Sequence, residues 1–466
     1  CLGLHILTIE LARDVLGWRD ADSTEFNPES THQVIALMPD QQGNLPKGGT
    51  MRLGAYPCHI EPGTMLEKIY GQSDISERHR HRYEFNNAYR EDFENIGLSL
   101  SGKWEDALPI GSGRMGGMVY GGVKEDQIHL NDDTLYGGAP MQRVNPDARK
   151  TLDTVRELLR QGRLDEARTL ARAGLVATPR YAGPYLPLCT LFLRFEGRGE
   201  VTDYRRELDI GSAVARTTFT KDGVHFTREY IASYPANVIA IRLTADQPGA
   251  ISLYASMMRR PYDPGTRITP EGRLLMQGRA TDGGVEYDCM VEARAEGGVI
   301  ETIGDSLHIS RADSATIYVA SDTSFRGAFP EAECALTLNN APDYDKLLAE
   351  HIADYRALYE RVSLSLGEGR PDVPTNERIH AMREGGHDEG LLALTFNFGR
   401  YLLIACSRPG SMAANLQGIW NDLFAPPWDS IFTVNINTEM NYWLSGPGNL
   451  NELAEPLFDL LRRLYD

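Results

Sequence analysis

Short runs of alternating apolar and polar residues fill the chain between residues 103 and 335, and this pattern constrains the fold most. The clearest runs are "RTTFTKDGVHFTREYIAS", "NVIAIRLTAD", "ISLYASMMR", "VEYDCMVEARAE" and "SATIYVAS". A period of two residues, broken by Asp-Gly and Gly-Gly turns, predicts short antiparallel strands. Many such strands in succession favour a β-sandwich. At 466 residues the whole chain is long enough for two to four domains, so we expect a multidomain protein.

Helical spacing replaces this alternation beyond residue 340. Apolar residues recur three and four positions apart in "DYDKLLAEHIADYRALYERVSLSL", "EGLLALTFNFGRYLLIACSR" and "NELAEPLFDLLRRLYD". These amphipathic segments, joined by short loops, predict the beginning of an all-α domain. One further helical segment, residues 145–175, is predicted as an insert among the strands.

The composition excludes several classes of partner. The chain has 47 Lys and Arg against 65 Asp and Glu, a formal charge of −18, which disfavours nucleic acid and anionic membranes. No run approaches the roughly 18 apolar residues of a membrane span. Six scattered cysteines without a C-x-x-C pair suggest neither a zinc site nor a disulfide framework. We expect no metal and no cofactor, and a cytoplasmic location, with the periplasm or secretion as alternatives.

A G-x-G-x-x-G spacing occurs at Gly111, Gly113 and Gly116, within "PIGSGRMGGMVYGG". This spacing binds a dinucleotide only where a strand precedes the glycines and a helix begins on them. The residues that follow alternate like a strand, a turn and a second strand, so no helix is predicted there. The motif therefore indicates a glycine-rich β-turn.

Aromatic and amide side chains are concentrated in "NLQGIWNDLFAPPWDSIFTVNINTEMNYW", residues 415–443. Three of the five tryptophans, Trp420, Trp428 and Trp443, lie in this stretch. Flat apolar rings stack on sugar rings, while amides and carboxylates bond sugar hydroxyls. The alternative is a loop with buried aromatic residues and turn-forming asparagines.

Two long motifs carry a specific resemblance. "KWEDALPIGSGRMGGMVYGGVKEDQIHLNDDTLYGGAP" and "CSRPGSMAANLQGIWNDLFAPPWDSIFTVNINTEMNYW" resemble glycoside hydrolase family 95, mostly α-L-fucosidases. The resemblance covers residues 103–466. It implies a β-sandwich over 103–335, a helical linker over 336–372 and the start of an (α/α)6 catalytic barrel over 373–466.

The same resemblance implies a mechanism of hydrolysis by inversion on an oligosaccharide or glycan. Asn435 and Asn437 would hold the attacking water, and a distant Asp would make the amide basic. The general acid, a Glu, and that Asp lie further along the family's chain than this sequence extends, so we expect a truncated enzyme of doubtful activity. Glu439 has no counterpart role and is expected to be structural or to contact sugar. A non-catalytic carbohydrate-binding remnant is the alternative.

Residues 1–102 have a different resemblance. "CLGLHILTIELARDVLGWRDADSTEF" and "RHRHRYEFNN" are similar to the glutaminase domain of CTP synthase, a class I glutamine amidotransferase of α/β fold. The resemblance implies that Cys1 is the nucleophile, that Gly3 lines the glutamine site, and that Glu25 and Arg82 bind L-glutamine. His5 departs from the Gln usual at its position. Glutamine hydrolysis for CTP synthesis is therefore an alternative function.

The two resemblances meet abruptly at "LSLSGKWEDAL", without a linker. Genuine fusions usually join complete domains through exposed, flexible segments. We therefore expect a chimeric or misassembled reading frame of bacterial origin.

Overall fold

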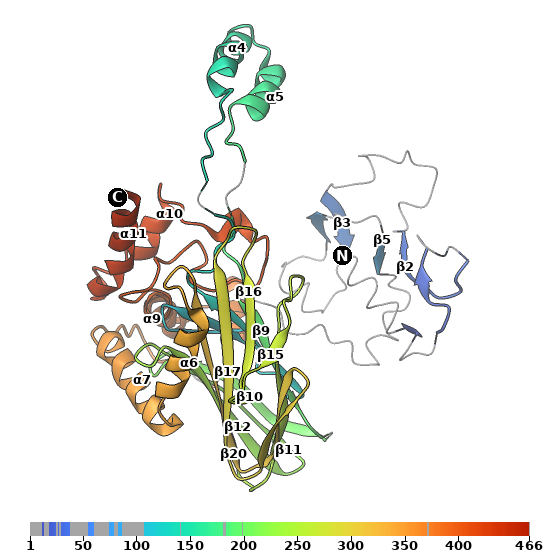
Figure 1. Cartoon of the computed structure of the whole chain (residues 1–466), viewed down its shortest axis with the longest axis vertical. Helices are drawn as coiled ribbons and strands as arrows, with labels where there is room; N and C mark the ends of the chain where they lie inside the picture. The colour runs from blue at the N-terminus through green and yellow to red at the C-terminus, as the bar shows by residue number, and fades with distance from the viewer. Residues whose placement is uncertain are drawn as a thin grey trace. The chain divides into compact units, whose positions relative to one another are not determined.

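A computed structural model describes most of the chain beyond residue 106 and short stretches before it (Figure 1). The described residues are 12–13, 18–24, 27, 29–37, 55–59, 74–78, 83–85, 107–139, 141–179, 183–197, 199–370 and 372–465. The chain divides into two compact units, one made of residues 1–103 and 369–391 and the other of residues 104–368 and 392–466.

The described residues of the first unit form two small sheets. β1 (Asp22–Ser23), β2 (Gln33–Leu37) and β5 (Tyr83–Phe85) form one, in which β1 is parallel and β5 antiparallel to β2. β3 (Ala55–His59) and β4 (Asp74–Arg78) pair antiparallel in the other. Helix α8 (Thr375–Arg383) also belongs to this unit, and Arg378 at its centre is paired with Asp388.

Two antiparallel sheets dominate the second unit. The larger consists, in spatial order, of β10 (Val201–Asp209), β11 (Val214–Lys221), β12 (Val224–Ser233), β13 (Val238–Ala245), β20 (Ser314–Thr323), β17 (Glu286–Glu296), β16 (Leu274–Arg279) and β15 (Thr266–Ile268). The other consists of β18 (Val299–Ile303), β19 (Ser306–Ala312), β14 (Ile251–Met258), β9 (Cys189–Phe195), β8 (Glu125–Asp132), β7 (Met115–Val119) and β6 (Leu108–Gly111).

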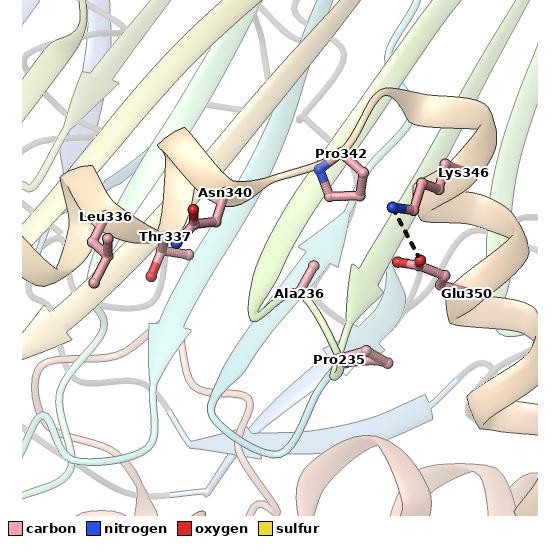
Figure 2. Close-up of a pocket in the computed structure, with 8 residues that line it drawn as sticks. All are labelled: Pro235, Ala236, Leu336, Thr337, Asn340, Pro342, Lys346 and Glu350. Atoms are coloured by element: carbon pink, nitrogen blue, oxygen red, sulfur yellow. Dashed lines mark ion pairs between the residues drawn. The ribbon is translucent and has the colours of Figure 1, made fainter.

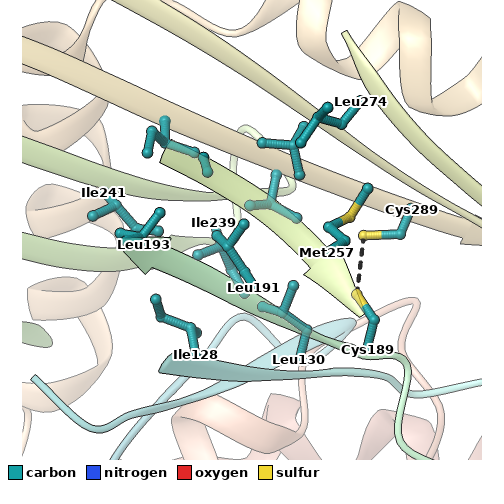
Figure 3. Close-up of a cluster of buried hydrophobic side chains, with 14 of the residues drawn as sticks. Ile128, Leu130, Cys189, Leu191, Leu193, Ile239, Ile241, Met257, Leu274 and Cys289 are labelled. Atoms are coloured by element: carbon teal, nitrogen blue, oxygen red, sulfur yellow. Dashed lines mark hydrogen bonds between the residues drawn. The ribbon is translucent and has the colours of Figure 1, made fainter. Parts of the chain in front are cut away.

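The two sheets enclose one apolar core, which confirms the predicted β-sandwich. Ile128 and Leu191 from the smaller sheet and Ile239 from the larger one are fully buried in the same cluster (Figure 3). On each strand the residues that point into this core alternate with residues on the other face, because side chains alternate along a strand. The period-two pattern in the sequence therefore arises because every second residue of a strand is buried in this core.

Helices complete the second unit where the 3.6-residue period predicts them. α6 (Pro330–Asn340) and α7 (Tyr344–Tyr359) cover the outer face of the larger sheet, where Leu338 and Leu347 are fully buried. The predicted insert forms the helical pair α4 (Ala148–Arg160) and α5 (Leu164–Gly174), which extends away from the sandwich (Figure 1). The remaining helices are α9 (Glu389–Cys406), the 3-10 turns η5 (Pro427–Ser430) and η6 (Asn451–Ala454), α10 (Asn437–Tyr442) and α11 (Glu455–Tyr465).

The G-x-G-x-x-G stretch is the β6–β7 hairpin, as the strand-turn-strand pattern predicts. Gly113 has a φ of +82° in the turn, and its N–H donates to the Ala405 carbonyl at the end of α9 (2.8 Å). A Cβ on Gly111 would collide with the same carbonyl oxygen, and one on Gly116 would lie 2.9 Å from Ile419. These glycines therefore let the hairpin approach the α9 end and the segment after it.

Candidate functional site

The segment that carries the aromatic and amide motif follows α9 and packs on the β6–β8 side of the smaller sheet. Trp420 holds it there. Its side chain is 6% exposed, and its indole Nε1 donates to the Ile110 carbonyl on β6 at 2.8 Å. Tyr185 donates from its hydroxyl to the carbonyl of the neighbouring Ile419 at 2.8 Å. The Trp420 ring is thus buried, which differs from the exposed ring that stacking on a sugar requires.

Two asparagines, both fully buried, join the sheet to the same segment. Asn131, near the end of β8, donates from Nδ2 to the Asn421 carbonyl (2.8 Å) and accepts from the Asn421 N–H (3.1 Å). Asn421 in turn donates from its side chain to the Tyr185 carbonyl at 2.9 Å. A buried amide costs free energy unless its donors and acceptors are satisfied, so these bonds select one path for the chain beyond residue 421.

A buried ion pair fixes the loop directly after α9. Both carboxylate oxygens of Asp133 accept from Arg326 Nη2 at 2.5 Å, and one also accepts from the Met412 N–H at 2.6 Å. Arg326 donates from its other terminal nitrogen to the Gly410 carbonyl at 3.1 Å. Burial raises the pKa of Asp133 to about 6, against the lowering effect of the Arg326 charge. The loop is therefore attached to the sandwich through a carboxylate that titrates in the weakly acidic range.

A left-handed turn presents Trp428 to solvent. Trp428, Asp429 and Ser430 have φ values of 49°, 57° and 49°, and such backbone costs roughly 1–2 kcal/mol at each residue with a side chain. The Tyr185 N–H donates to the Asp429 carbonyl (2.9 Å), and Ser430 Oγ donates to Gln417 Oε1 (2.5 Å). These bonds offset the strain, and the Trp428 side chain stays 82% exposed.

Of the two asparagines predicted to hold water, Asn437 is the first residue of α10 and Asn435 lies two residues before it. Both Asn435 and Asn437 are exposed, as are Glu439 and the predicted stacking residue Trp443, which is 62% exposed. The buried side of the same helix is fixed by Tyr442, whose hydroxyl bonds Ser407 Oγ and accepts the Ala414 N–H, both at 2.8 Å. One side of this short helix is thus anchored, while the amide-bearing side faces outward.

Exposed apolar side chains lie along the same part of the chain as these amides. They are Leu423, Val434, Ile436, Met440, Phe458, Leu461 and Leu464. A surface pocket of about 350 Å³ lies elsewhere, over α6 and α7, where Lys346 and Glu350 pair across 3.7 Å (Figure 2). Among the described residues, none of those predicted from the sequence to bind sugar lines that pocket.

Several predictions fall outside the residues that the structure describes. Cys1, Gly3, Glu25 and Arg82 all lie there. Within the described stretches, no three His, Cys, Asp or Glu side chains are grouped in a way that could hold a metal ion. Across the same residues, no helix combines the length and the apolarity that crossing a bilayer requires.

The sequence reasoning missed Asn131, Asp133 and Arg326, which position the motif, and it grouped Asn421 with the sugar-binding amides although Asn421 is buried. A signal for two of them exists, because the alternation of "QIHLND" ends in three consecutive polar residues, "NDD", all of which are buried. A polar run at the buried end of a strand needs partners. The sequence does not reveal that these partners lie almost 200 to 300 residues further along.

Asp133 generates a testable prediction on stability. Its folded-state pKa of about 6 exceeds the ordinary 3.8, so its protonated form stabilises the fold below about pH 4 and this contribution is lost as the pH rises through 6. Between pH 4 and 7 the wild-type chain should therefore lose about 2–3 kcal/mol more free energy of unfolding than Asp133→Asn. Urea unfolding across this range, with the exposed Asp282→Asn as control, measures the difference. Parallel profiles for wild type and Asp133→Asn would contradict it.

Comparison with known proteins divides the second unit at a similar place, between the β-sandwich and the helices that follow it. Residues 99–328 match the model of the glycosyl hydrolase family 65 N-terminal domain, and residues 343–466 match that of the glycosyl hydrolase family 95 catalytic domain. The chain is 34% identical to alpha-L-fucosidase 2 of Arabidopsis thaliana over 407 residues, 78% of this chain and 48% of that protein. It is 28% identical to the probable alpha-fucosidase A of Aspergillus niger over 389 residues, 77% of this chain and 48% of that protein.

A separate match covers the N-terminal segment. The chain is 52% identical to CTP synthase of Coprothermobacter proteolyticus over 105 residues, which is 22% of this chain and 20% of that protein. The chain thus spans about half the length of the α-fucosidases it matches, and a fifth of the CTP synthase. Both resemblances are confirmed: residues 343–466 match the glycosyl hydrolase family 95 catalytic domain, and the N-terminal segment is similar to CTP synthases.

Proposed function

We propose that the second unit supplies part of an inverting, α-L-fucosidase-like glycoside hydrolase that acts on terminal fucosyl linkages. One observation carries the proposal. Asn435 and Asn437 are exposed at the beginning of α10, while Tyr442 on the same helix is buried and hydrogen-bonded. The identity of 34% to an α-L-fucosidase across this region supports the substrate class.

The proposed chemistry divides the work between amides and carboxylates. An amide carbonyl oxygen can orient a water molecule, but a neutral amide is a poor base, so a carboxylate must finally take the proton. We assign the orientation to Asn435 and Asn437. A Glu acting as general acid would face them across the gap that an inverting site keeps for water, roughly 6.5–9.5 Å for a carboxyl pair. Glu439 is assigned a contact to sugar hydroxyls.

The tryptophans take different parts in this proposal. Trp428 and Trp443 offer exposed rings that can stack on the apolar face of a sugar. Trp420 is assigned a positioning part, because its buried ring and its bond to Ile110 attach the motif to the sandwich. We further propose that α9, α10 and α11 begin an (α/α)6 barrel over 373–466, with the linker over 336–372 containing the C-terminal part of α6 and all of α7.

The hydrolase proposal is tested with Asn437→Ala, made at the matching position of a full-length family homologue. Removing one of the two amides should lower release of L-fucose from an α-fucosylated oligosaccharide by at least about 10²-fold. Because Asn437 is exposed, the free energy of unfolding should change by less than about 0.5 kcal/mol. The matched control is Asn340→Ala, which removes an exposed amide on α6. Equal, measurable turnover by the wild-type enzyme and Asn437→Ala would contradict the assignment of Asn437 as a residue that orients the water.

Calorimetry separates the hydrolase from a carbohydrate-binding remnant. Binding of the same oligosaccharide without turnover, lost in Trp428→Ala, supports the remnant. If neither binding nor turnover is detected, the result argues against any glycan role for this chain.

A second candidate function rests on the identity of 52% to a CTP synthase over the N-terminal segment. We propose L-glutamine as its ligand, with Cys1 as nucleophile, Gly3 lining the site, and Glu25 and Arg82 binding the substrate. The cytoplasm is the proposed compartment for this activity. Ammonia release from L-glutamine should be abolished in Cys1→Ala and retained in Cys58→Ala. Equal release by wild type and Cys1→Ala excludes this mechanism.

A further inference from the structure

Two cysteines from opposite sheets of the sandwich meet in its core. Cys189 is the first residue of β9 in the smaller sheet, and Cys289 lies on β17 in the larger sheet. Their Sγ atoms are 3.8 Å apart, although 100 residues separate them along the chain (Figure 3). The scattered cysteines of the sequence gave no sign of this contact, because strand order brings the two residues together.

We propose that Cys189 and Cys289 form a disulfide that links the two sheets when the chain meets a disulfide oxidant. The proposal is independent of the glycosidase and amidotransferase assignments. A disulfide bond is about 2.05 Å long, so the two sulfur atoms must approach by about 1.8 Å, which small side-chain rotations at two positions can supply. A disulfide between facing sheets is a known device of β-sandwiches.

The surroundings of the pair favour this bond over other uses of the thiols. Cys189 and Cys289 are 3% and 0% exposed, and they lie in the apolar cluster that contains Met257 and Leu274. No group able to hold a metal ion occurs among the described residues, so a metal does not explain the pair. A buried thiol pair in an apolar cluster has few redox partners except its own members.

The other described cysteines serve as internal references. Cys334 on α6 donates from its thiol to the Asp288 carbonyl at 3.6 Å, and Cys406 at the end of α9 donates to the Leu403 carbonyl at 3.9 Å. Both are buried like the pair, but each thiol bonds to a backbone oxygen. They should therefore stay reduced under conditions that oxidise Cys189 and Cys289.

Oxidised glutathione is a suitable oxidant for the reaction. One protein thiolate attacks a glutathione sulfur, which forms a mixed disulfide and releases one glutathione thiolate. The second protein thiolate then attacks the protein sulfur of that mixed disulfide and releases the other glutathione. Two protein thiols are oxidised to one disulfide, and one oxidised glutathione is reduced to two thiols.

Access to the pair determines when the bond forms. The hydrogen bond from Cys189 and burial both raise the pKa of the Cys289 thiol, and the thiolate is the reacting species. Oxidised glutathione also cannot reach side chains that are 3% or less exposed. The bond should therefore form during folding, or when the strand ends open, and slowly in the folded chain.

Refolding of the full chain in a glutathione redox buffer tests the proposal. After refolding, free thiols are alkylated under denaturing conditions and the chain is digested without reductant. Mass spectrometry should find the Cys189 peptide linked to the Cys289 peptide, with Cys334 and Cys406 alkylated. Since the closed loop spans about 100 residues, the linked chain should also melt about 5–15 °C higher than the reduced chain.

Matched variants give the second readout. Cys289→Ala should abolish the difference in melting temperature between oxidised and reduced chains, and Cys334→Ala should preserve it. The peptide measurement on the wild-type chain needs no variant, so it decides the question even where a variant does not fold. Alkylation of both Cys189 and Cys289 after refolding in the oxidising buffer, or linkage of either to another cysteine, would overturn the proposal.

Discussion

The close approach of the β6–β7 hairpin to the end of α9 is the constraint on which the rest of the second unit depends. Gly111 and Gly113 bring hairpin backbone against the Ala405 carbonyl, where a side chain on Gly111 would collide. Gly116 leaves room for Ile419 and for the Trp420 ring in the same way. A dinucleotide motif uses glycines so that phosphate can approach backbone. In this chain the same spacing of glycines allows the end of α9 and the segment after it to approach the hairpin backbone.

Buried polar contacts then fix the path of the loop that follows α9. Trp420 bonds Ile110, Asn421 bonds Asn131, and Met412 bonds Asp133, so three points along the loop after α9 are tied to the sandwich. Breaking any one of these contacts leaves a buried polar group unsatisfied, which makes alternative paths costly. The exposed amides at the start of α10 follow this fixed segment. The sandwich thereby helps to orient these amides.

The sequence predicts the sandwich strands and the main helices well, because each depends on local periodicity. It does not distinguish Trp420 from Trp428, since both occur in one motif and only the fold buries the first and exposes the second. It gives no sign that Cys189 meets Cys289, because strand order, and not spacing along the chain, brings them together. Contacts between segments that are distant in the sequence are thus the feature of the structure that sequence patterns do not predict.

Gly111→Ala tests most directly whether the hairpin positions the motif. The added Cβ meets backbone rather than a flexible side chain, so the free energy of unfolding should fall by about 1–3 kcal/mol. Backbone amides of residues 405–421 should exchange hydrogen faster, while those of β13 and β20 in the sandwich core keep their protection. Gly327→Ala, which meets nothing within 4 Å, should change neither quantity. Unchanged stability and unchanged exchange in Gly111→Ala would contradict the account.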